Sequence, residues 1–205
     1  MSTYTDIRYD YNLPAGFGGA MVLIKTQTVS SAVGSIVFVD GTDGVVLDDT
    51  YRTYMFTFSS MHPSNDGVEF RFNVSIDTGS NYNVAKTSTL FQGIHSEDNG
   101  TALLEISAGA SLDQQTTGQA LTVGLGGAVA DECLSGTLHL FSPSSTTFVK
   151  HYISNCNSYY PDGDGLSANS HIGGYANTTS AVDAVEFKMN AGNIDAGTIK
   201  MYGIA

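Results

Sequence analysis

The sequence predicts an all-β protein: an antiparallel β-sandwich, jelly-roll-like, preceded by an N-terminal arm. The first observation is residues 68–76, where apolar and polar side chains alternate with the two-residue period of a half-buried strand. The second is that similar short segments recur between clusters of turn-forming residues, as in sandwiches. The third is composition, because 23 glycines and only 14% charged residues suit tight turns and short strands better than helices.

The alternation in residues 68–76 also fixes the register that we expect for this strand. A slip of one residue would move all of its apolar side chains into water. The expected buried face consists of Val68, Phe70, Phe72, Val74 and Ile76. The expected wet face consists of Glu69, Arg71, Asn73 and Ser75.

The chain divides into an arm over residues 1–20 and a single sandwich domain over residues 21–205, a length that fits one sizeable core. The arm has no clean hydrophobic period but carries Tyr4, Tyr9, Tyr11 and Phe17. Aromatic side chains are costly to leave in water. We therefore expect the arm to lie over its own sandwich or over a neighbouring subunit.

About nine or ten strands separated by turns are expected, the number typical of a sandwich or jelly roll. The loop over residues 59–67 contains Pro63 and Asp66–Gly67, and predicts that residues 51–58 pair with residues 68–76. The turn Pro143–Ser144–Ser145 predicts a second hairpin. The other expected strands are residues 21–25, 35–39, 45–47, 86–94, 103–107, 121–124, 135–142, 146–153, 184–189 and 198–204.

The charge balance limits the classes of partner. Eight basic against twenty acidic residues give a net charge of −12, which argues against a surface built to bind nucleic-acid phosphates. No apolar run reaches the roughly 18 residues of a membrane span, and residues 1–10 lack the features of a secretory signal. We expect neither binding of nucleic acid nor insertion into a membrane.

Catalytic and cofactor-binding motifs are absent from the sequence, so a non-enzymatic protein without a cofactor is expected. Five histidines could supply metal ligands, but their spacing does not support a metal site. A hairpin symmetric about Pro143–Ser145 would place His139 opposite Phe148 and His151 opposite Gly136, on different faces. The adjacent carboxylates Asp48 and Asp49 would also point to opposite faces of an extended chain, which excludes a shared hydrolytic site.

A candidate binding loop follows the second hairpin. Asp162 and Asp164 have the spacing of the first calcium-loop ligands, but no Glu arrives where the twelve-residue loop needs it. Tyr159 and Tyr160 precede them, and tyrosines beside carboxylates are suited to hold sugars or to contact another protein. The alternative is an ordinary loop with no ligand.

The two cysteines, Cys133 and Cys156, flank the predicted hairpin. A symmetric turn would bring Cys133 close to the position opposite Ser154, so the two thiols could approach each other. A bridge is therefore permitted, although a protein folded in a reducing cytosol keeps its thiols free. We expect two free thiols.

Four further stretches bear on the family of this chain: residues 39–51, 135–141, 143–151 and 192–204. They resemble structural proteins of tailed phages, especially marine ones, and the resemblance covers most of the chain from residue 21 onward. The resemblance implies a β-sandwich virion protein of the capsid surface, tail or fibre. The resemblance implies no catalytic residues for this chain.

The leading hypothesis is therefore a non-enzymatic virion protein on the exterior of a phage particle, made in the host cytoplasm. We expect it to assemble as a homotrimer and with other virion proteins. A module of a fibre tip that binds a host glycan or receptor is the second hypothesis, and a hydrolase on a β-sandwich is the third.

Overall fold

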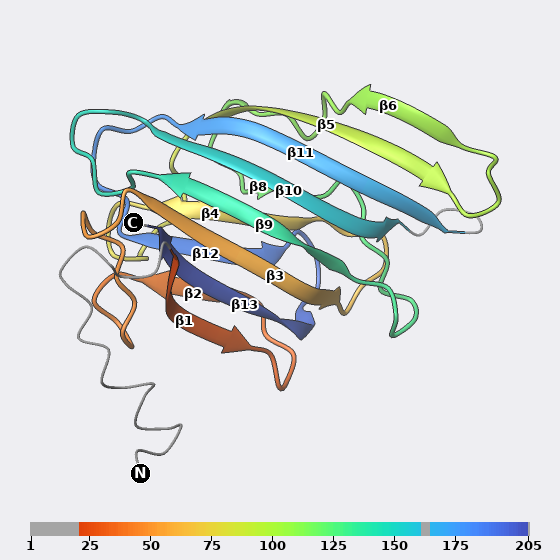
Figure 1. Ribbon diagram of the computed structural model, residues 1–205, viewed down its shortest axis with the longest axis horizontal. Coiled ribbons are helices and arrows are strands. Elements are labelled where there is room, and N and C mark those ends of the chain that lie inside the picture. The colour runs from red at the N-terminus through yellow and green to blue at the C-terminus, as the bar shows by residue number, and fades with distance from the viewer. Residues whose placement is uncertain (1–20, 161–164, 205) are drawn as a thin grey trace, which may run out of the picture.

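Two antiparallel sheets pack face to face in the computed structural model, which describes residues 21–160 and 165–204 (Figure 1). This architecture confirms the predicted all-β sandwich. The large sheet has the order β1 (Met21–Thr28), β13 (Ile194–Ile204), β3 (Thr53–Pro63), β9 (Leu134–Phe141), β10 (Lys150–Tyr160), β11 (Leu166–Ala176), β5 (Lys86–Ser96) and β6 (Ala102–Ile106), and β7 (Asp113–Gln115) also pairs with β5. The small sheet has the order β2 (Ile36–Val39), β12 (Ala184–Met189), β4 (Phe70–Ser75) and β8 (Gln119–Ala120).

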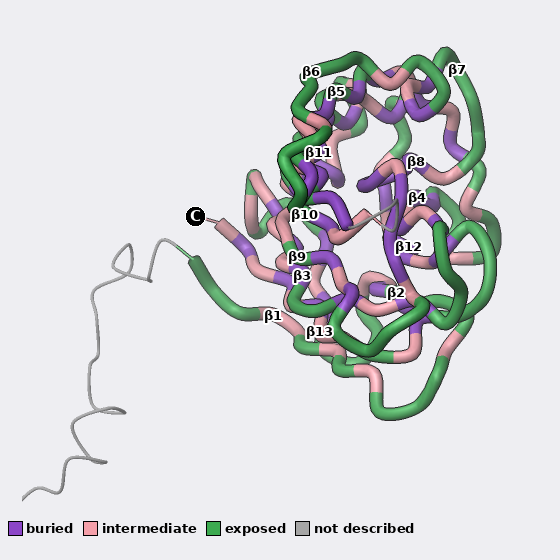
Figure 2. Tube along the Cα trace, turned by 90° about the vertical axis from the view of Figure 1, so that its right-hand side faces the viewer, coloured by how far each residue is buried: buried purple, intermediate pink, exposed green. Residues whose placement is uncertain are grey.

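The core lies between the sheets, and alternation along the strands builds it. In β10, side chains at even positions from Lys150 to Ser158 are buried, whereas those at odd positions from His151 to Asn157 are exposed. The edge-on view in Figure 2 shows buried segments between the layers and exposed segments on the outside. Phe187 of β12 lies at the centre of an aromatic cluster that joins both sheets. The fold thus depends on inward-facing side chains from strands far apart in sequence.

The predicted pairing of residues 51–58 with residues 68–76 is wrong. β3 lies in the large sheet between β13 and β9, whereas β4 lies in the small sheet between β12 and β8. The connection crosses from one sheet to the other, so the turn signals at Pro63 and Gly67 mark a change of layer and not a hairpin. Sequence alternation is compatible with either arrangement, because it specifies which face is buried but not which strand lies alongside.

The two faces of β4 also differ from the expectation. Phe70, Phe72 and Val74 are buried as predicted, but so are Asn73 and Ser75, and Ile76 is 42% exposed. The segment after β4 folds back over Asn73, whose Nδ2 donates a hydrogen bond to the carbonyl oxygen of Tyr82 at 2.5 Å. Asn73 and Ser75 are therefore buried polar residues, whereas the sequence predicted that they face water.

The β9–β10 hairpin has a longer turn than predicted. His139 pairs with Ile153 and Gly136 with Cys156, so each partner lies five residues further along than a symmetric turn requires. An odd shift reverses the relation between faces, and His139 and His151 both lie on the outer face of the large sheet. The prediction that these histidines lie on different faces is wrong because the turn runs from residue 142 to residue 149.

Two expected strands, residues 45–47 and residues 121–124, are not strands in the structure. The two-residue strand β8 ends just before the second of them. The predicted N-terminal arm, with Tyr4, Tyr9, Tyr11 and Phe17, lies outside the described residues. No helix in residues 21–160 or 165–204 is long and apolar enough to cross a membrane.

Candidate functional site

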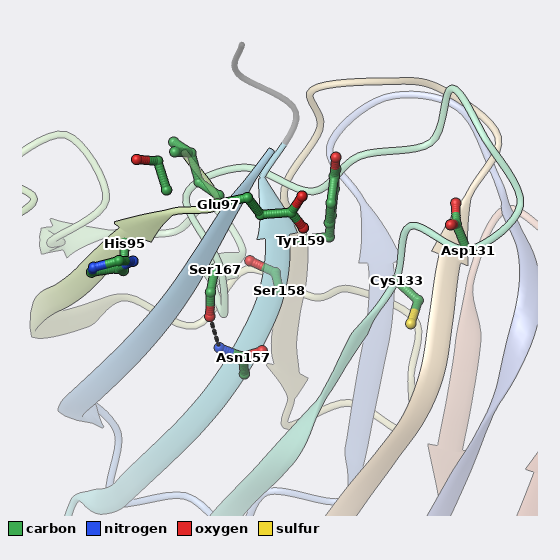
Figure 3. A pocket seen from close by; sticks show the side chains of 10 residues that line it. His95, Glu97, Asp131, Cys133, Asn157, Ser158, Tyr159 and Ser167 are labelled. Carbon is green, nitrogen blue, oxygen red and sulfur yellow. Dashed lines mark hydrogen bonds between the residues drawn. The ribbon is translucent and has the colours of Figure 1, made fainter. Parts of the chain in front are cut away.

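A pocket of about 330 Å³ opens at the end of the large sheet where β5 and β10 finish and β11 begins (Figure 3). Strand pairing brings these segments together, because Ser167 of β11 lies opposite both Tyr159 of β10 and His95 of β5. The loop before β9 closes one side with Asp131 and Cys133. The pocket is therefore built from four segments that are distant in sequence.

Most of the residues that line the pocket have polar side chains. Asn157 Nδ2 donates a hydrogen bond to Ser167 Oγ at 3.0 Å, which fixes the amide at the floor. Figure 3 shows the Glu97 side chain extending toward the ring of Tyr159. An imidazole from His95 and a second carboxyl group from Asp131 complete the set. Carboxylates, an amide and an aromatic ring in one open depression suit a ligand with several hydroxyl groups.

The structure separates the two tyrosines that the sequence placed in one candidate loop. Tyr159 lines the pocket, and its backbone is held on both sides, since its N–H donates to the Cys133 carbonyl oxygen and its carbonyl accepts from Gly126. Tyr160 does not line this pocket and packs against Gly124. A Cβ atom on Gly124 would lie 2.2 Å from the Tyr160 ring, so this glycine is needed for the close approach. Asp162 and Asp164 lie outside the described residues.

Sequence reasoning missed four of the polar residues in this pocket: His95, Glu97, Asp131 and Asn157. His95 was considered only as an isolated metal ligand. The signal that could have found them is the polar character of the ends of β5 and β10. The polar ends of β5 and β10 can be recognised as one site only when β11 is known to lie between these two strands.

Among the described residues, no group of three or more His, Cys, Asp and Glu side chains is arranged to hold a metal ion.

Both cysteines are free in the structure. Cys133 lies opposite Tyr159, whereas Cys156 lies opposite Gly136, so the two positions are offset by three residues, or roughly 10 Å, along the sheet. A disulfide requires Cα atoms closer than about 7 Å. The prediction that Cys133 lies close to the position opposite Ser154 is therefore wrong. The observed register disfavours a disulfide more strongly than the predicted register did.

The two thiols should differ in reactivity. Cys133 is partly exposed at the pocket, whereas Cys156 is 1% exposed and burial raises the pKa of its thiol to about 11. Iodoacetamide should therefore modify Cys133 in the folded protein and reach Cys156 only after denaturation. Intact-mass measurement without reductant should show one adduct on the native chain and two on the unfolded chain. A mass lower by two hydrogens with no adduct would reveal a bridge instead.

A His–Asp pair lies where β3 ends and β13 begins. His62 Nδ1 is 2.6 Å from Asp195 Oδ1, and His62 Nε2 is 3.1 Å from the carbonyl oxygen of Val129. Burial lowers the pKa of His62, but the hydrogen bonds to Asp195 and Val129 and the nearby charges outweigh it and raise the pKa overall. Because both ring nitrogens are engaged, the pair ties the loop before β9 to the sheet and leaves no nitrogen for catalysis.

Replacing His62 by Ala should therefore cost more stability in acid than in base. The fold favours the protonated ring, so this stabilisation is complete below the usual pKa of about 6.5 and is lost as pH rises through the raised pKa. We expect a loss of about 1–3 kcal/mol near pH 6 and a smaller loss near pH 8.5. Urea unfolding at both pH values measures it, and His95→Ala, at an exposed position, is the control. A loss that grows with pH would contradict this role.

No family model, curated protein or solved structure significantly matches this chain.

Proposed function

We propose that this chain is a structural protein on the exterior of a phage virion, as a capsid decoration, tail or fibre component. It acts by assembling with itself, as a homotrimer, and with other virion proteins, and it catalyses no reaction. The proposal rests on the resemblance of residues 39–51, 135–141, 143–151 and 192–204 to such proteins, and on the physical features below. Its site of synthesis is the cytoplasm of the host.

The observation that best supports self-assembly is the character of the two sheet edges. All five residues of β6 are exposed, with Leu104 at 77% and Ile106 at 69% (Figure 2). At the opposite edge, β1 exposes Met21 and Leu23, each at 52%. An exposed apolar edge strand offers unpaired backbone groups to another chain, and soluble monomers usually protect such edges. A subunit interface would cover these edges and pair their free backbone groups.

The two edges are also complementary. Within the described part of the large sheet every neighbouring pair is antiparallel, so β1 and β6 run in opposite directions and a β6 edge can receive the β1 edge of another copy. The only charged residue of β1 is Lys25, and the only charged residue of β6 is Glu105. A head-to-tail contact places opposite charges together, whereas an edge paired with its own copy brings like charges close.

The test is the oligomeric state of the full chain and of Leu104→Lys. We expect a trimer for the wild type by analytical ultracentrifugation and dissociation of the variant, because a lysine on an edge strand opposes edge pairing. Val129→Lys, which also places a charge at an exposed apolar position away from the edges, is the control. A wild-type monomer at all concentrations would contradict the proposal.

A second candidate function, binding of a host glycan, is supported by the pocket around Tyr159. Tyr159→Ala should abolish glycan binding in that case, while Tyr175→Ala, on the outer face of β11, should retain it. Glycan-array binding of the wild type followed by the two variants tests this function. Absence of binding by the wild-type oligomer would exclude it.

A further inference from the structure

Three polar side chains on three strands are buried where the chain crosses from the small sheet to the large one. Lys86, at the start of β5, is 0% exposed, Asn73 of β4 is 3% exposed and Glu186 of β12 is 9% exposed. Asn73 and Glu186 lie directly opposite each other in the β4–β12 pairing. A primary amine and a carboxamide thus meet in a region shielded from water, and a buried carboxyl group is carried at the strand position opposite the carboxamide.

The hydrogen bonds of Lys86 suit an unprotonated amine. Its Nζ donates to Asn73 Oδ1 at 2.6 Å and to the carbonyl oxygen of Val84 at 2.8 Å. Two acceptors satisfy the two N–H groups of a neutral amine, whereas an ammonium group would need a third. Burial lowers the pKa of Lys86 to about 8, so the form with a free electron pair is accessible near neutral pH.

The carboxamide of Asn73 is held firmly in front of this amine. Its Nδ2 donates to the carbonyl oxygens of Tyr82 and Thr116, and its Oδ1 accepts from the backbone N–H of Val74 at 3.0 Å as well as from Lys86. Two donors on one carbonyl oxygen polarise the C=O bond toward the charge of a tetrahedral intermediate. Because a C=O bond is about 1.23 Å long, Lys86 Nζ lies within about 3.8 Å of Asn73 Cγ, close to the distance of a near-attack geometry.

We propose that Lys86 and Asn73 join spontaneously in an isopeptide bond that links β5 of the large sheet to β4 of the small sheet. The electron pair of Lys86 Nζ attacks Asn73 Cγ, the Cγ–Nδ2 bond breaks, and the Asn73 side-chain nitrogen leaves as ammonia. One proton moves from the attacking amine to the leaving nitrogen. The reaction is an aminolysis of an amide, so it needs no oxidant, reductant or added co-reactant.

We assign the proton transfer to Glu186, the carboxyl group opposite Asn73. Its Oε2 is buried and lies 2.9 Å from Lys188 Nζ, but it accepts no well-directed hydrogen bond, so this oxygen has capacity for a further donor. A carboxyl group carried at the strand position directly opposite Asn73 can take the proton from the amine and return it to the departing ammonia. The inference does not depend on the proposed function, since the bond would form within a single folded chain.

The mass of the full-length chain and its tryptic peptides test the bond directly. Trypsin cleaves after Arg71, Lys86 and Lys150, and residues 87–149 contain no other Lys or Arg. An acylated Lys86 is not cleaved. We therefore expect the chain to be lighter than its sequence by one ammonia, and a denaturing digest to yield residues 72–150 as one peptide. The full mass together with separate peptides 72–86 and 87–150 would overturn the proposal.

Two variants separate the bond from other losses of ammonia. Lys86→Arg keeps a tryptic site but has no nucleophilic amine, so it should show the full calculated mass and complete cleavage. Loss of ammonia in that variant would point to cyclisation of an asparagine onto its own backbone and would overturn the assignment. In Glu186→Gln the bond should form at least tenfold more slowly in a time course after refolding. Formation at the wild-type rate would overturn the role of Glu186 while leaving the bond itself established.

Discussion

Phe187→Ala should destabilise the protein by about 3–5 kcal/mol, the range for truncating a fully buried Phe in a well-packed core. Phe187 is 0% exposed, and its ring packs against four other phenylalanines with centroid distances of 5.1 to 6.1 Å. Two of these, Phe56 and Phe58, come from β3 of the large sheet. Removing the ring thus leaves a cavity at the contact between the two layers and loses two edge-to-face contacts, one tilted contact and one stacked contact.

Urea unfolding followed by tyrosine fluorescence or circular dichroism measures this loss. Phe148→Ala is the matched control, because Phe148 is 71% exposed and its truncation should change the free energy of unfolding by no more than about 0.5 kcal/mol. Equal losses in the two variants would mean that the aromatic cluster does not hold the sheets together.

Gln119→Leu should cost about 2–5 kcal/mol, although it replaces a polar core residue with an apolar one. The Gln119 side chain is fully buried, and its Oε1 accepts from Ser88 Oγ at 2.5 Å and from Tyr152 Oη at 3.1 Å. Its Nε2 donates to the carbonyl oxygens of Ala110 and Ala120, both at 3.0 Å. Leucine satisfies none of these groups, and each buried group left without a partner costs about 1–3 kcal/mol.

The same unfolding measurement tests this prediction, with Gln115→Leu as the control. Gln115 is exposed and its side chain bonds only to Asp113 among the described residues, so its replacement should have little effect. If Gln119→Leu is as stable as the wild type, the network from β8 to Ser88 and Tyr152 contributes nothing to the packing of the sheets.

The fold class was predictable from the sequence because strand alternation is a local property. The alternation in residues 70–74 correctly predicted that Phe70, Phe72 and Val74 are buried. The pairing of β3 with β13 and β9, and that of β4 with β12 and β8, was not predictable, since both depend on contacts between distant segments. The burial of Asn73 has the same cause, because a later segment carrying Tyr82 covers it.

In the β9–β10 hairpin, the error in the predicted turn length changed every residue pairing that depends on it. The prediction placed the turn symmetrically about Pro143–Ser145, but the turn extends to residue 149, and the register moves by five residues. That shift alone reversed the predicted relation between His139 and His151 and moved Cys133 away from Cys156. Turn length cannot be deduced from alternation when several serines and threonines can continue either a turn or a strand.

The candidate pocket was predicted only through Tyr159. The residues that surround it come from β5, from the start of β11 and from the loop before β9, and these segments are adjacent only in the folded sheet. Asp162 and Asp164, the other half of the predicted site, lie outside the described residues. A single sequence therefore reveals one side chain of the pocket and not the pocket.

The proposed place of this chain in a virion is tested most directly by electron cryomicroscopy of intact phage particles produced from a genome that encodes it. We expect density on the particle exterior into which the sandwich fits, in groups of three, with the edges formed by β1 and β6 at the contacts between copies. Purified infectious particles that contain no such density, and whose peptides by mass spectrometry do not include this chain, would contradict the proposed virion role.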